Sequence, residues 1–447
     1  MDKRFFNMFG LTEDQAIALL KTPTEQLAAP TEHYVAVSHL INFPTERSIN
    51  ALIEVVQNPA PDLYDRITRR KALESLGRLE AKDALPVIRA CLGDGDCYTV
   101  ENAVWAIGEI GTEDGEIFEE IAQLLEKPNQ SYRTIIQTLA KLNYQPAVSR
   151  IEKFVAVDDE PIVSAALSAI CRLTGDYSQI GQVVAFLSVA SVNARRACIQ
   201  DLIDANYYDA IPQIARCPVS IVFRLRGIRL LADSGIATGK ISFASLEPDL
   251  DRVIQDRPSD LDLVHEYDQK PSLDFVINEL YHTDFGRCYL ASKTLLEWHS
   301  LVTRSPIPAT SQQPSVTGHH SRLTEEEVPE ALLQTWEKEA HNDYGAHYHV
   351  VKLLGWLKYA PAYDLLVEAL QNTMPQFQKS RAAAAIALGN LGDERAIPLL
   401  KECLNSKIFD LKYASLLALE QLGDSTGKEI AANDSDWLIR TKATANF

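Results

Sequence analysis

Apolar and polar residues alternate along much of this chain with the period of an α-helix. In residues 98–111, YTVENAVWAIGEIG, Val100, Val104 and Ile107 fall on one side of a helix, whereas Glu101 falls elsewhere. A pair of such helices cannot bury its apolar face until another pair stacks on it. The pattern therefore predicts amphipathic helices that pack on neighbours of the same kind.

The same pattern returns at a nearly constant interval. Segments with small residues in the middle and a Leu or Ile pair near the end occupy residues 69–79, 98–111, 131–142, 161–173, 192–205 and 380–392. Among the first five, the last apolar positions, from Leu79 to Ala205, are separated by 31 or 32 residues. A period near thirty residues is typical of a solenoid. We therefore expect an all-α fold, an α-solenoid of helix pairs.

The regularity of the repeats varies along the chain. We divide it into an N-terminal cap, regular repeats, an irregular helical segment and C-terminal repeats with a closing cap, at residues 1–30, 31–235, 236–341 and 342–447. Thr12 is the expected N-cap of the first helix. The stretch 303–322 is rich in Ser, Pro and Gln, and it is predicted to be a flexible loop because it has too few apolar residues to order itself.

The composition limits the expected partners and the compartment. The chain has 43 Lys and Arg against 61 Asp and Glu, a net charge of -18, and we find no basic patch, so a nucleic-acid partner is not expected. Its seven Cys are spread singly, as in a protein with reduced thiols. The N-terminus lacks an apolar segment of signal-peptide length, and no run is long enough for membrane insertion. We expect a soluble, cytoplasmic protein.

Charged and aromatic residues recur at two positions of the repeat helices, four residues apart and therefore on one side of each helix. These positions, which we call the inner stripe, hold Arg70, Glu74, Glu101, Trp105, Arg133, Gln137, Arg196, Gln200, Tyr289, Lys293, Tyr348 and Lys352. The second helix of each pair usually lines the concave face of such a solenoid.

A cationic, aromatic groove suits a flat conjugated ligand with carboxylates, because rings stack and guanidinium groups pair with acids. We predict that the ligand is bound by Arg70, Glu101, Trp105, Arg133, Arg196, Tyr289, Tyr348 and Lys352. The alternative is that each arginine forms hydrogen bonds between repeats.

Two places offer groups for proton transfer. Asp343, Tyr344 and His347 lie three or four residues apart on one predicted helix, so they can face the groove together. In the segment 265–269, HEYDQ, the carboxylate of Asp268 is a candidate acceptor for pyrrole-like N–H groups. The alternatives are that His347 is an ordinary half-buried helix residue and that Asp268 lies in a solvated turn.

Several catalytic classes have no support in the sequence. The chain contains no G-x-S-x-G, Walker loop, G-x-G-x-x-G at a strand end or H-E-x-x-H. Its one His-Glu step, at His265, argues against an iron hydroxylase built on helical repeats, which needs several such pairs. His319 and His320 lie in the predicted loop and are a weak metal signal. We therefore predict no metal site.

The repeats themselves resemble a known family. RRKALESLGRLEAKDALPVIRACL, ENAVWAIGEIG and SRAAAAIALGNLGDERAIPLLKECL are similar to the HEAT-like repeats of the E/F-type phycobilin lyases, and ENAVWA is the most specific piece. The chain length and the segment DYGAHYHVVKLLGWLKYAPA are closest to the longer, phycoerythrin-type members. The resemblance covers nearly the whole chain outside residues 303–322. It implies a HEAT-like α-solenoid of the armadillo-type superhelical class.

The resemblance also implies a function. Such an enzyme binds a linear tetrapyrrole, here phycoerythrobilin as the substrate with no further cofactor, and attaches it to a cysteine of a phycobiliprotein subunit, here phycoerythrin α. The acceptor thiol adds across the ethylidene group of ring A, so the nucleophile belongs to the acceptor. Family members often act with a second E/F-type subunit. The alternatives are a chaperone or adaptor for phycobiliprotein subunits, and a lyase-isomerase that converts phycoerythrobilin to phycourobilin.

Overall fold

The computed structural model describes residues 10–58, 62–304, 324, 326–337 and 344–445 of the chain. These residues contain α-helices and short 3-10 turns and no strand, so the all-α prediction is confirmed for the described part. None of the described helices is both long enough and apolar enough to cross a membrane. The chain divides into two compact units, Met1–Val183 and Val184–Phe447. We call them unit 1 and unit 2.

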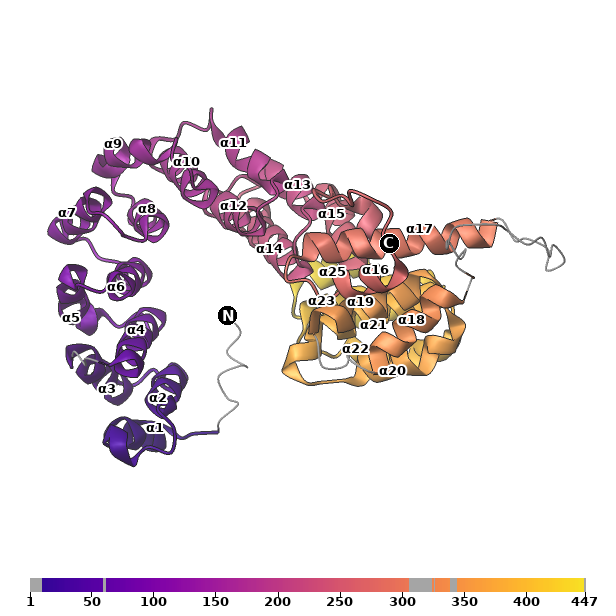
Figure 1. Cartoon of the computed structure of the whole chain (residues 1–447), viewed down its shortest axis with the longest axis horizontal. Helices are drawn as coiled ribbons and strands as arrows, with labels where there is room; N and C mark the ends of the chain where they lie inside the picture. Colours follow the sequence, from indigo (N-terminus) through magenta and orange to yellow (C-terminus); the bar gives the residue numbers. More distant parts are fainter. Residues whose placement is uncertain (1–9, 59–61, 305–323, 325, 338–343, 446–447) are drawn as a thin grey trace. The chain divides into compact units, whose positions relative to one another are not determined.

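Unit 1 is a run of helix pairs. Its helices are α1 (Glu13–Leu20), α2 (Glu32–Leu40), α3 (Glu46–Gln57), α4 (Leu63–Arg78), α5 (Leu85–Ala90), α6 (Cys97–Ile110), α7 (Gly115–Gln123), α8 (Tyr132–Lys141), α9 (Val148–Ile151) and α10 (Glu160–Thr174). In Figure 1, α2, α4, α6 and α8 form an inner row, and α3, α5 and α7 form an outer row. The predicted repeat helices at 69–79, 98–111 and 131–142 are α4, α6 and α8, all members of the inner row.

Helix ends in unit 1 follow the local signals in the sequence. Thr12 caps α1 as predicted: its side chain accepts a hydrogen bond from the Gln15 amide, and the Gln15 side chain accepts one from the Thr12 amide. Asp96 caps α6 in the same way, by accepting from the Thr99 amide. Polar side chains at these positions therefore mark where the helices begin.

The inner helices approach each other closely where one of them carries glycine. A Cβ atom on Gly77 of α4 would lie 2.9 Å from the Ala106 Cα of α6, closer than real contacts allow. This close packing explains the small residues in the middle of each repeat segment. The core of unit 1 is continuous, from Ala16 in α1 to Leu173 in α10.

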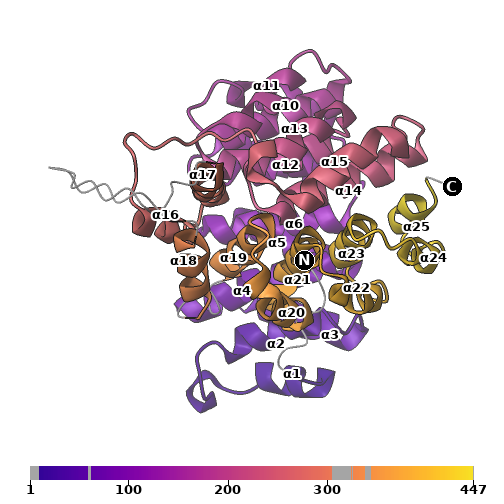
Figure 2. The same cartoon turned by 90° about the vertical axis from the view of Figure 1, so that its right-hand side faces the viewer.

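Unit 2 contains the remaining helices. They are α12 (Val192–Asp204), α13 (Ile211–Arg216), α14 (Ile221–Ala237), α15 (Phe243–Gln255), α16 (Leu273–Glu279), α17 (Phe285–Arg304), α18 (Glu327–Thr335), α19 (Tyr344–Trp356), α20 (Tyr363–Gln371), α21 (Gln378–Leu391), α22 (Ile397–Cys403), α23 (Phe409–Gln421), α24 (Thr426–Ala431) and α25 (Trp437–Thr444), and α11 (Ile180–Ala185) crosses the boundary between the units. Figure 2 shows α19, α21 and α23 in a row, as in a regular solenoid. Of the predicted loop 303–322, residues 305–322 lie outside the described part.

The end of unit 2 returns to its beginning. In α25, the ammonium group of Lys442 lies 2.7 Å from Glu247 and 2.9 Å from Asp251 of α15. Just before α25, Asp436 pairs with Arg229 of α14 at 2.8 Å. A linear solenoid has contacts only between neighbouring repeats. These contacts therefore close unit 2 on itself, which covers helix faces that a linear array would leave open.

Candidate functional site

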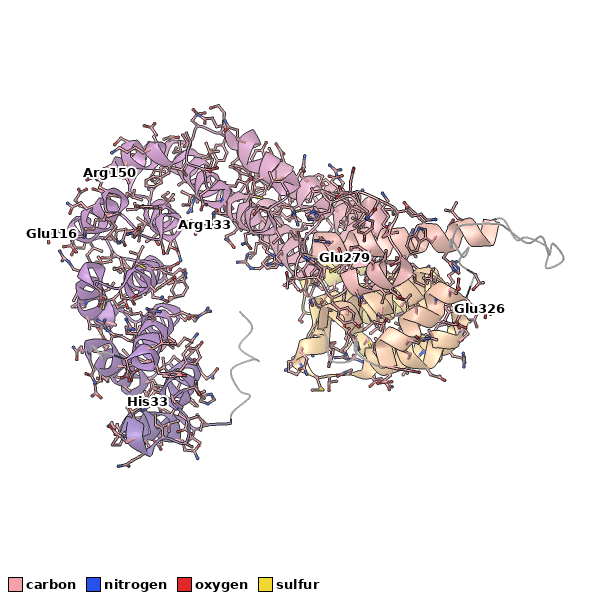
Figure 3. All side chains as sticks on the ribbon, viewed as in Figure 1. His33, Glu116, Arg133, Arg150, Glu279 and Glu326 are labelled. Carbon is pink, nitrogen blue, oxygen red and sulfur yellow. The ribbon has the colours of Figure 1, made fainter. Side chains whose placement is uncertain are left out.

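The inner stripe of unit 1 lies on α4, α6 and α8. Arg70, Glu101, Trp105 and Arg133 are all half-buried. Figure 3 shows Arg133 on the inner side of the curve of unit 1. The structure therefore brings these four predicted residues onto one face.

Most of their polar atoms are engaged between repeats. The Arg70 guanidinium donates to both oxygens of Asp96 at 2.7 Å, and the Arg133 guanidinium donates to the Pro161 carbonyl. Glu101 accepts from the Thr134 hydroxyl at 3.1 Å. For Arg70 and Arg133 the structure thus shows the alternative role, hydrogen bonds between repeats. Their part in ligand binding stays a prediction.

Aromatic rings on this face carry cations above them. Arg70 lies 4.8 Å from the Tyr98 ring centre, and Arg78 lies 5.6 Å from the Trp105 ring centre. Such pairs are favourable because the face of an aromatic ring is electronegative. A guanidinium group already lies over each of these two rings, so the stacking of a flat ligand on the inner face of unit 1 stays a prediction.

In unit 2, three residues of the inner stripe are buried instead of lining a groove. Tyr289, Tyr348 and Lys352 have almost no exposed surface and surround the carboxylate of Asp256. Both tyrosine hydroxyls donate to its Oδ2, at 2.9 Å from Tyr289, and Lys352 donates to the Gln255 carbonyl at 2.6 Å. Their predicted exposure to a ligand is wrong, because the helices of the closed unit pack around them.

This buried cluster sets two basic side chains, Arg224 and Lys352, against the one carboxylate of Asp256. The Arg224 guanidinium donates to Asp256, and burial, which disfavours the carboxylate, is outweighed by Arg224 and Lys352, so the pKa of Asp256 stays below its ordinary value. Burial lowers the pKa of Lys352 to about 8. The cluster therefore joins α14, α15, α17 and α19 in the interior, and a substrate cannot reach it without unfolding.

The predicted proton-transfer residues do not form one site in the described residues. Asp343 lies outside the described part, as does the side chain of Tyr344. His347 is fully buried, with ring centres 4.0 Å from Trp336 and 4.7 Å from Phe377, so its predicted position in an open groove is wrong. Asp268 is exposed in a segment without helical structure, which agrees with a solvated turn.

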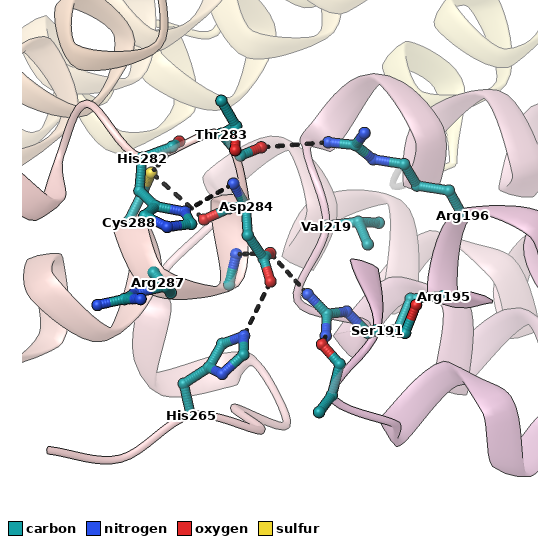
Figure 4. A network of polar contacts seen from close by, with 12 residues as sticks. Ser191, Arg195, Arg196, Val219, His265, His282, Thr283, Asp284, Arg287 and Cys288 are labelled. Atoms are coloured by element: carbon teal, nitrogen blue, oxygen red, sulfur yellow. Dashed lines mark hydrogen bonds and ion pairs between the residues drawn. The ribbon is translucent and has the colours of Figure 1, made fainter. Parts of the chain in front are cut away.

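A different polar cluster lies beside the segment that holds Asp268 (Figure 4). Asp284, immediately before α17, accepts from the Arg195 guanidinium of α12 at 2.6 Å and from the Gly286 amide at 2.8 Å, both through Oδ1. Its Oδ2 lies 2.8 Å from Nε2 of His265. Burial favours the neutral acid, but the hydrogen bonds from Arg195 and His265 outweigh it and lower the pKa of Asp284.

The predicted ligand-binding residue Arg196 lies at the edge of this cluster. Arg196 is half-buried, and its guanidinium group makes one long, exposed hydrogen bond to the Thr283 carbonyl at 3.4 Å (Figure 4). It also lies 5.0 Å from the ring centre of Phe223, an aromatic residue that is 38% exposed. Arg196 is therefore the stripe arginine of unit 2 that can bind a ligand carboxylate next to an exposed ring. Sequence reasoning missed Asp284, although an Asp directly before a helix is an N-terminal signal.

The described residues offer no group of three or more His, Cys, Asp or Glu that could hold a metal ion. The thiols are poor nucleophiles where they are deeply buried. Burial raises the pKa of Cys217 and of Cys288 to about 12, so both stay protonated near neutral pH. These two thiols are therefore unsuited to attack a ligand.

Two parts of the chain match known repeat families. Residues 62–123 match the family described as HEAT repeats, and residues 380–406 match the family described as PBS lyase HEAT-like repeat. The first range covers α4 to α7, and the second covers most of α21 and all of α22. The fold is therefore a HEAT-repeat solenoid, as the sequence resemblance implied.

Three relatives match this chain over longer stretches of sequence. The chain is 57% identical, over 99% of its own length and 99% of the relative, to the Uncharacterized phycocyanin operon protein Y of Pseudanabaena tenuis. It is 32% identical to the Bilin biosynthesis protein CpeY of a Synechococcus species, over 95% of this chain and 99% of that protein. It is 31% identical to the Phycocyanobilin lyase subunit alpha of Synechococcus elongatus, over 50% of this chain and 86% of that subunit.

Proposed function

Because the chain belongs to the E/F-type phycobilin lyase family with HEAT repeats, we propose that it attaches phycoerythrobilin to a cysteine of the phycoerythrin α subunit through a thioether bond. The observation that carries the proposal is the full-length relationship to the Bilin biosynthesis protein CpeY, at 32% identity. The relative with 57% identity is named for a phycocyanin operon, so phycocyanobilin and phycocyanin subunits are the competing substrates in the test.

The pigment makes three physical demands on its enzyme. Its propionates need cations, its conjugated rings need an aromatic or apolar surface, and the addition needs a group that moves a proton. Arg196 and the exposed ring of Phe223, 5.0 Å apart, meet the first two demands in unit 2. We therefore propose that a pigment propionate binds Arg196 and that the adjoining ring packs on Phe223.

The buried thiols support an acceptor cysteine from outside this chain. Cys217 and Cys288 have a raised pKa and no route to solvent, so neither can attack the pigment. The enzyme then holds the pigment, and the acceptor subunit supplies the sulfur. The name of the Phycocyanobilin lyase subunit alpha indicates that this relative works with a further subunit, and we propose such a partner here.

The test is a matrix of co-expressions. The chain is combined with the enzymes that make phycoerythrobilin or phycocyanobilin and with single phycoerythrin or phycocyanin subunits, with and without a second E/F-type subunit. Absorbance and the mass of the pigmented peptide are then measured. We expect a phycoerythrobilin adduct on one cysteine of phycoerythrin α. A phycocyanobilin adduct on phycocyanin would overturn the substrate assignment. Attachment no faster than the spontaneous reaction would favour the chaperone function, and a phycourobilin spectrum would show isomerisation.

A matched pair of arginine variants tests the pigment site. Arg196→Ala is expected to weaken pigment binding about 10-fold or more, because a charge-assisted hydrogen bond to a carboxylate is lost. Arg216→Ala is the control, since Arg216 pairs with the exposed Asp262 at 3.2 Å. Equal pigment affinity in the two variants would contradict the proposed site.

A further inference from the structure

Three elements of unit 2, far apart in sequence, meet at the carboxylate of Asp284 (Figure 4). Arg195 comes from α12, His265 from the segment between α15 and α16, and Asp284 from the start of α17. The Arg195 guanidinium is itself fixed, because it also donates to the Val189 and Ala190 carbonyls at 2.8 and 2.9 Å. The carboxylate is therefore held from the interior by a guanidinium group that makes two further hydrogen bonds to the backbone.

The histidine is not needed to balance the charge of Asp284. Arg195 already neutralises this carboxylate, and the Gly286 amide caps the same oxygen. His265 takes the other oxygen alone. A carboxylate that accepts from an imidazole fixes the tautomer and the orientation of the ring. The Arg195–Asp284 pair is enough to join α12 to α17. The contact between Asp284 and His265 therefore orients the imidazole in addition to this structural role.

Gly286 makes this geometry tight. A Cβ atom there would lie 3.0 Å from Arg195 Nη2, 3.1 Å from Asp284 Oδ1 and 3.2 Å from His265 Cδ2. The three side chains therefore converge on the one residue that has no side chain. A larger residue would require these neighbouring side chains to shift by a few tenths of an ångström.

The exposed fraction of the side chain increases from Arg195 through Asp284 to His265. The side chains of Arg195, Asp284 and His265 are 0%, 9% and 24% exposed. The ionised carboxylate accepts a hydrogen bond from the Nε2–H group, and in this tautomer of the imidazole Nδ1 is an acceptor. This order places a buried cation behind a carboxylate and the carboxylate behind a half-exposed imidazole. Enzymes that use histidine as a general base also orient its imidazole with a carboxylate.

We propose that His265 is the catalytic residue that transfers the proton during thioether formation, with Asp284, Arg195 and Gly286 as positioning residues. This inference rests on the proposed function, and it assigns the proton-transfer step to a residue outside the inner stripe. Arg196, next to Arg195 in sequence, reaches the Thr283 carbonyl, directly before Asp284. A pigment carboxylate on Arg196 is thereby brought to the same end of α12 and α17 as the imidazole.

The step balances without a further reactant. Nδ1 of His265 takes the proton of the acceptor thiol, and the sulfur forms a bond to the outer carbon of the ring A ethylidene as the carbon–carbon π bond breaks. The imidazolium, stabilised by Asp284, then returns the proton to the ring carbon of that former double bond. Nothing leaves, no electron is transferred to or from another molecule, and the histidine ends neutral.

The test separates chemistry from pigment binding. The full-length chain, with its partner subunit where the co-expression matrix requires one, carries His265→Ala or His265→Gln. Non-covalent pigment binding is followed by absorbance, and covalent attachment to the acceptor subunit is followed by mass. We expect unchanged pigment affinity and an attachment rate lowered about 100-fold or more in both variants. Added imidazole should restore part of the rate in His265→Ala, an effect that a purely structural histidine would not give.

Two controls and two contrary results complete the design. His33→Ala removes a histidine of unit 1 whose ring bonds the Thr22 carbonyl, and Asp262→Asn removes an exposed carboxylate, so both should attach pigment at the wild-type rate. Attachment at the wild-type rate by His265→Ala would overturn the inference. Normal pigment binding with slow attachment that imidazole does not restore would also overturn it. A failure of the proposed function is distinguishable, because the wild-type chain would then attach no pigment faster than the spontaneous reaction.

Discussion

The buried cluster around Asp256 leads to a quantitative prediction about stability. The change Asp256→Asn keeps the shape of the side chain and removes its charge. Arg224 is fully buried and would lose the carboxylate that neutralises it, while Lys352 would lose the nearest anion. Asp256→Asn therefore leaves buried cations without a counter-charge. The same change in a surface ion pair would leave only a solvent-exposed cation unpaired.

The expected loss follows from this burial. Removing one partner of a buried ion pair costs about 3–5 kcal/mol, because the remaining charge keeps its desolvation penalty. Water cannot compensate, since the side chains of Asp256 and Arg224 have no exposed surface. At roughly 2–4 °C per kcal/mol for a domain of 150–250 residues, the midpoint of unit 2 should fall by roughly 6–20 °C.

The assay is thermal unfolding followed by circular dichroism, combined with hydrogen exchange measured by mass spectrometry. Exchange should accelerate in peptides from α15 and α19, which assigns the loss to unit 2. Asp262→Asn is the matched control, because its pair with Arg216 is solvent-exposed and should contribute at most about 1 kcal/mol. A loss below about 1 kcal/mol in Asp256→Asn would refute the view that this carboxylate is the required counter-charge.

Two further changes test the interior of unit 2. Burial lowers the pKa of His349 to about 3, so between this value and about 6.5 the unfolded chain binds more protons than the folded chain, and stability falls as the pH drops. Between pH 7 and pH 5, the free energy of unfolding should fall by about 2 kcal/mol less in His349→Leu than in the wild type, as measured by denaturant titration. An equal fall in both proteins would contradict this. In Gly355→Ala the new Cβ atom would lie 2.4 Å from the Ala387 Cα, so α19 and α21 would have to move apart. The free energy of unfolding, measured with denaturant, should fall by about 1–3 kcal/mol. Gly181→Ala, where a Cβ atom meets nothing within 4 Å, should be neutral or stabilising, and equal effects of the two changes would show that the close packing is unimportant.

Part of the candidate site was predictable, because its signals are local. The inner stripe identified Arg196, and the segment 265–269 was singled out for the carboxylate of Asp268. The contact of His265 in this segment with Asp284 was not predictable. Asp284 lies 19 residues from His265 and 89 from Arg195, and nothing in the spacing of these residues indicates that they meet.

By itself the sequence determined the helices, their pairing and the family. A 3.6-residue period and a repeat near thirty residues specify amphipathic helices that stack on their neighbours, and this required no knowledge of distant contacts. The tertiary structure decided which of the equivalent faces stay open. Lys352 and Trp105 occupy the same position of their repeats, yet Lys352 is buried and Trp105 remains half-exposed. Helical periodicity gives only the side of a helix on which a residue lies, whereas the element that covers this side is set by contacts distant in sequence, such as those of Lys352 with the carbonyls of Ile254 and Gln255, 98 and 97 residues away.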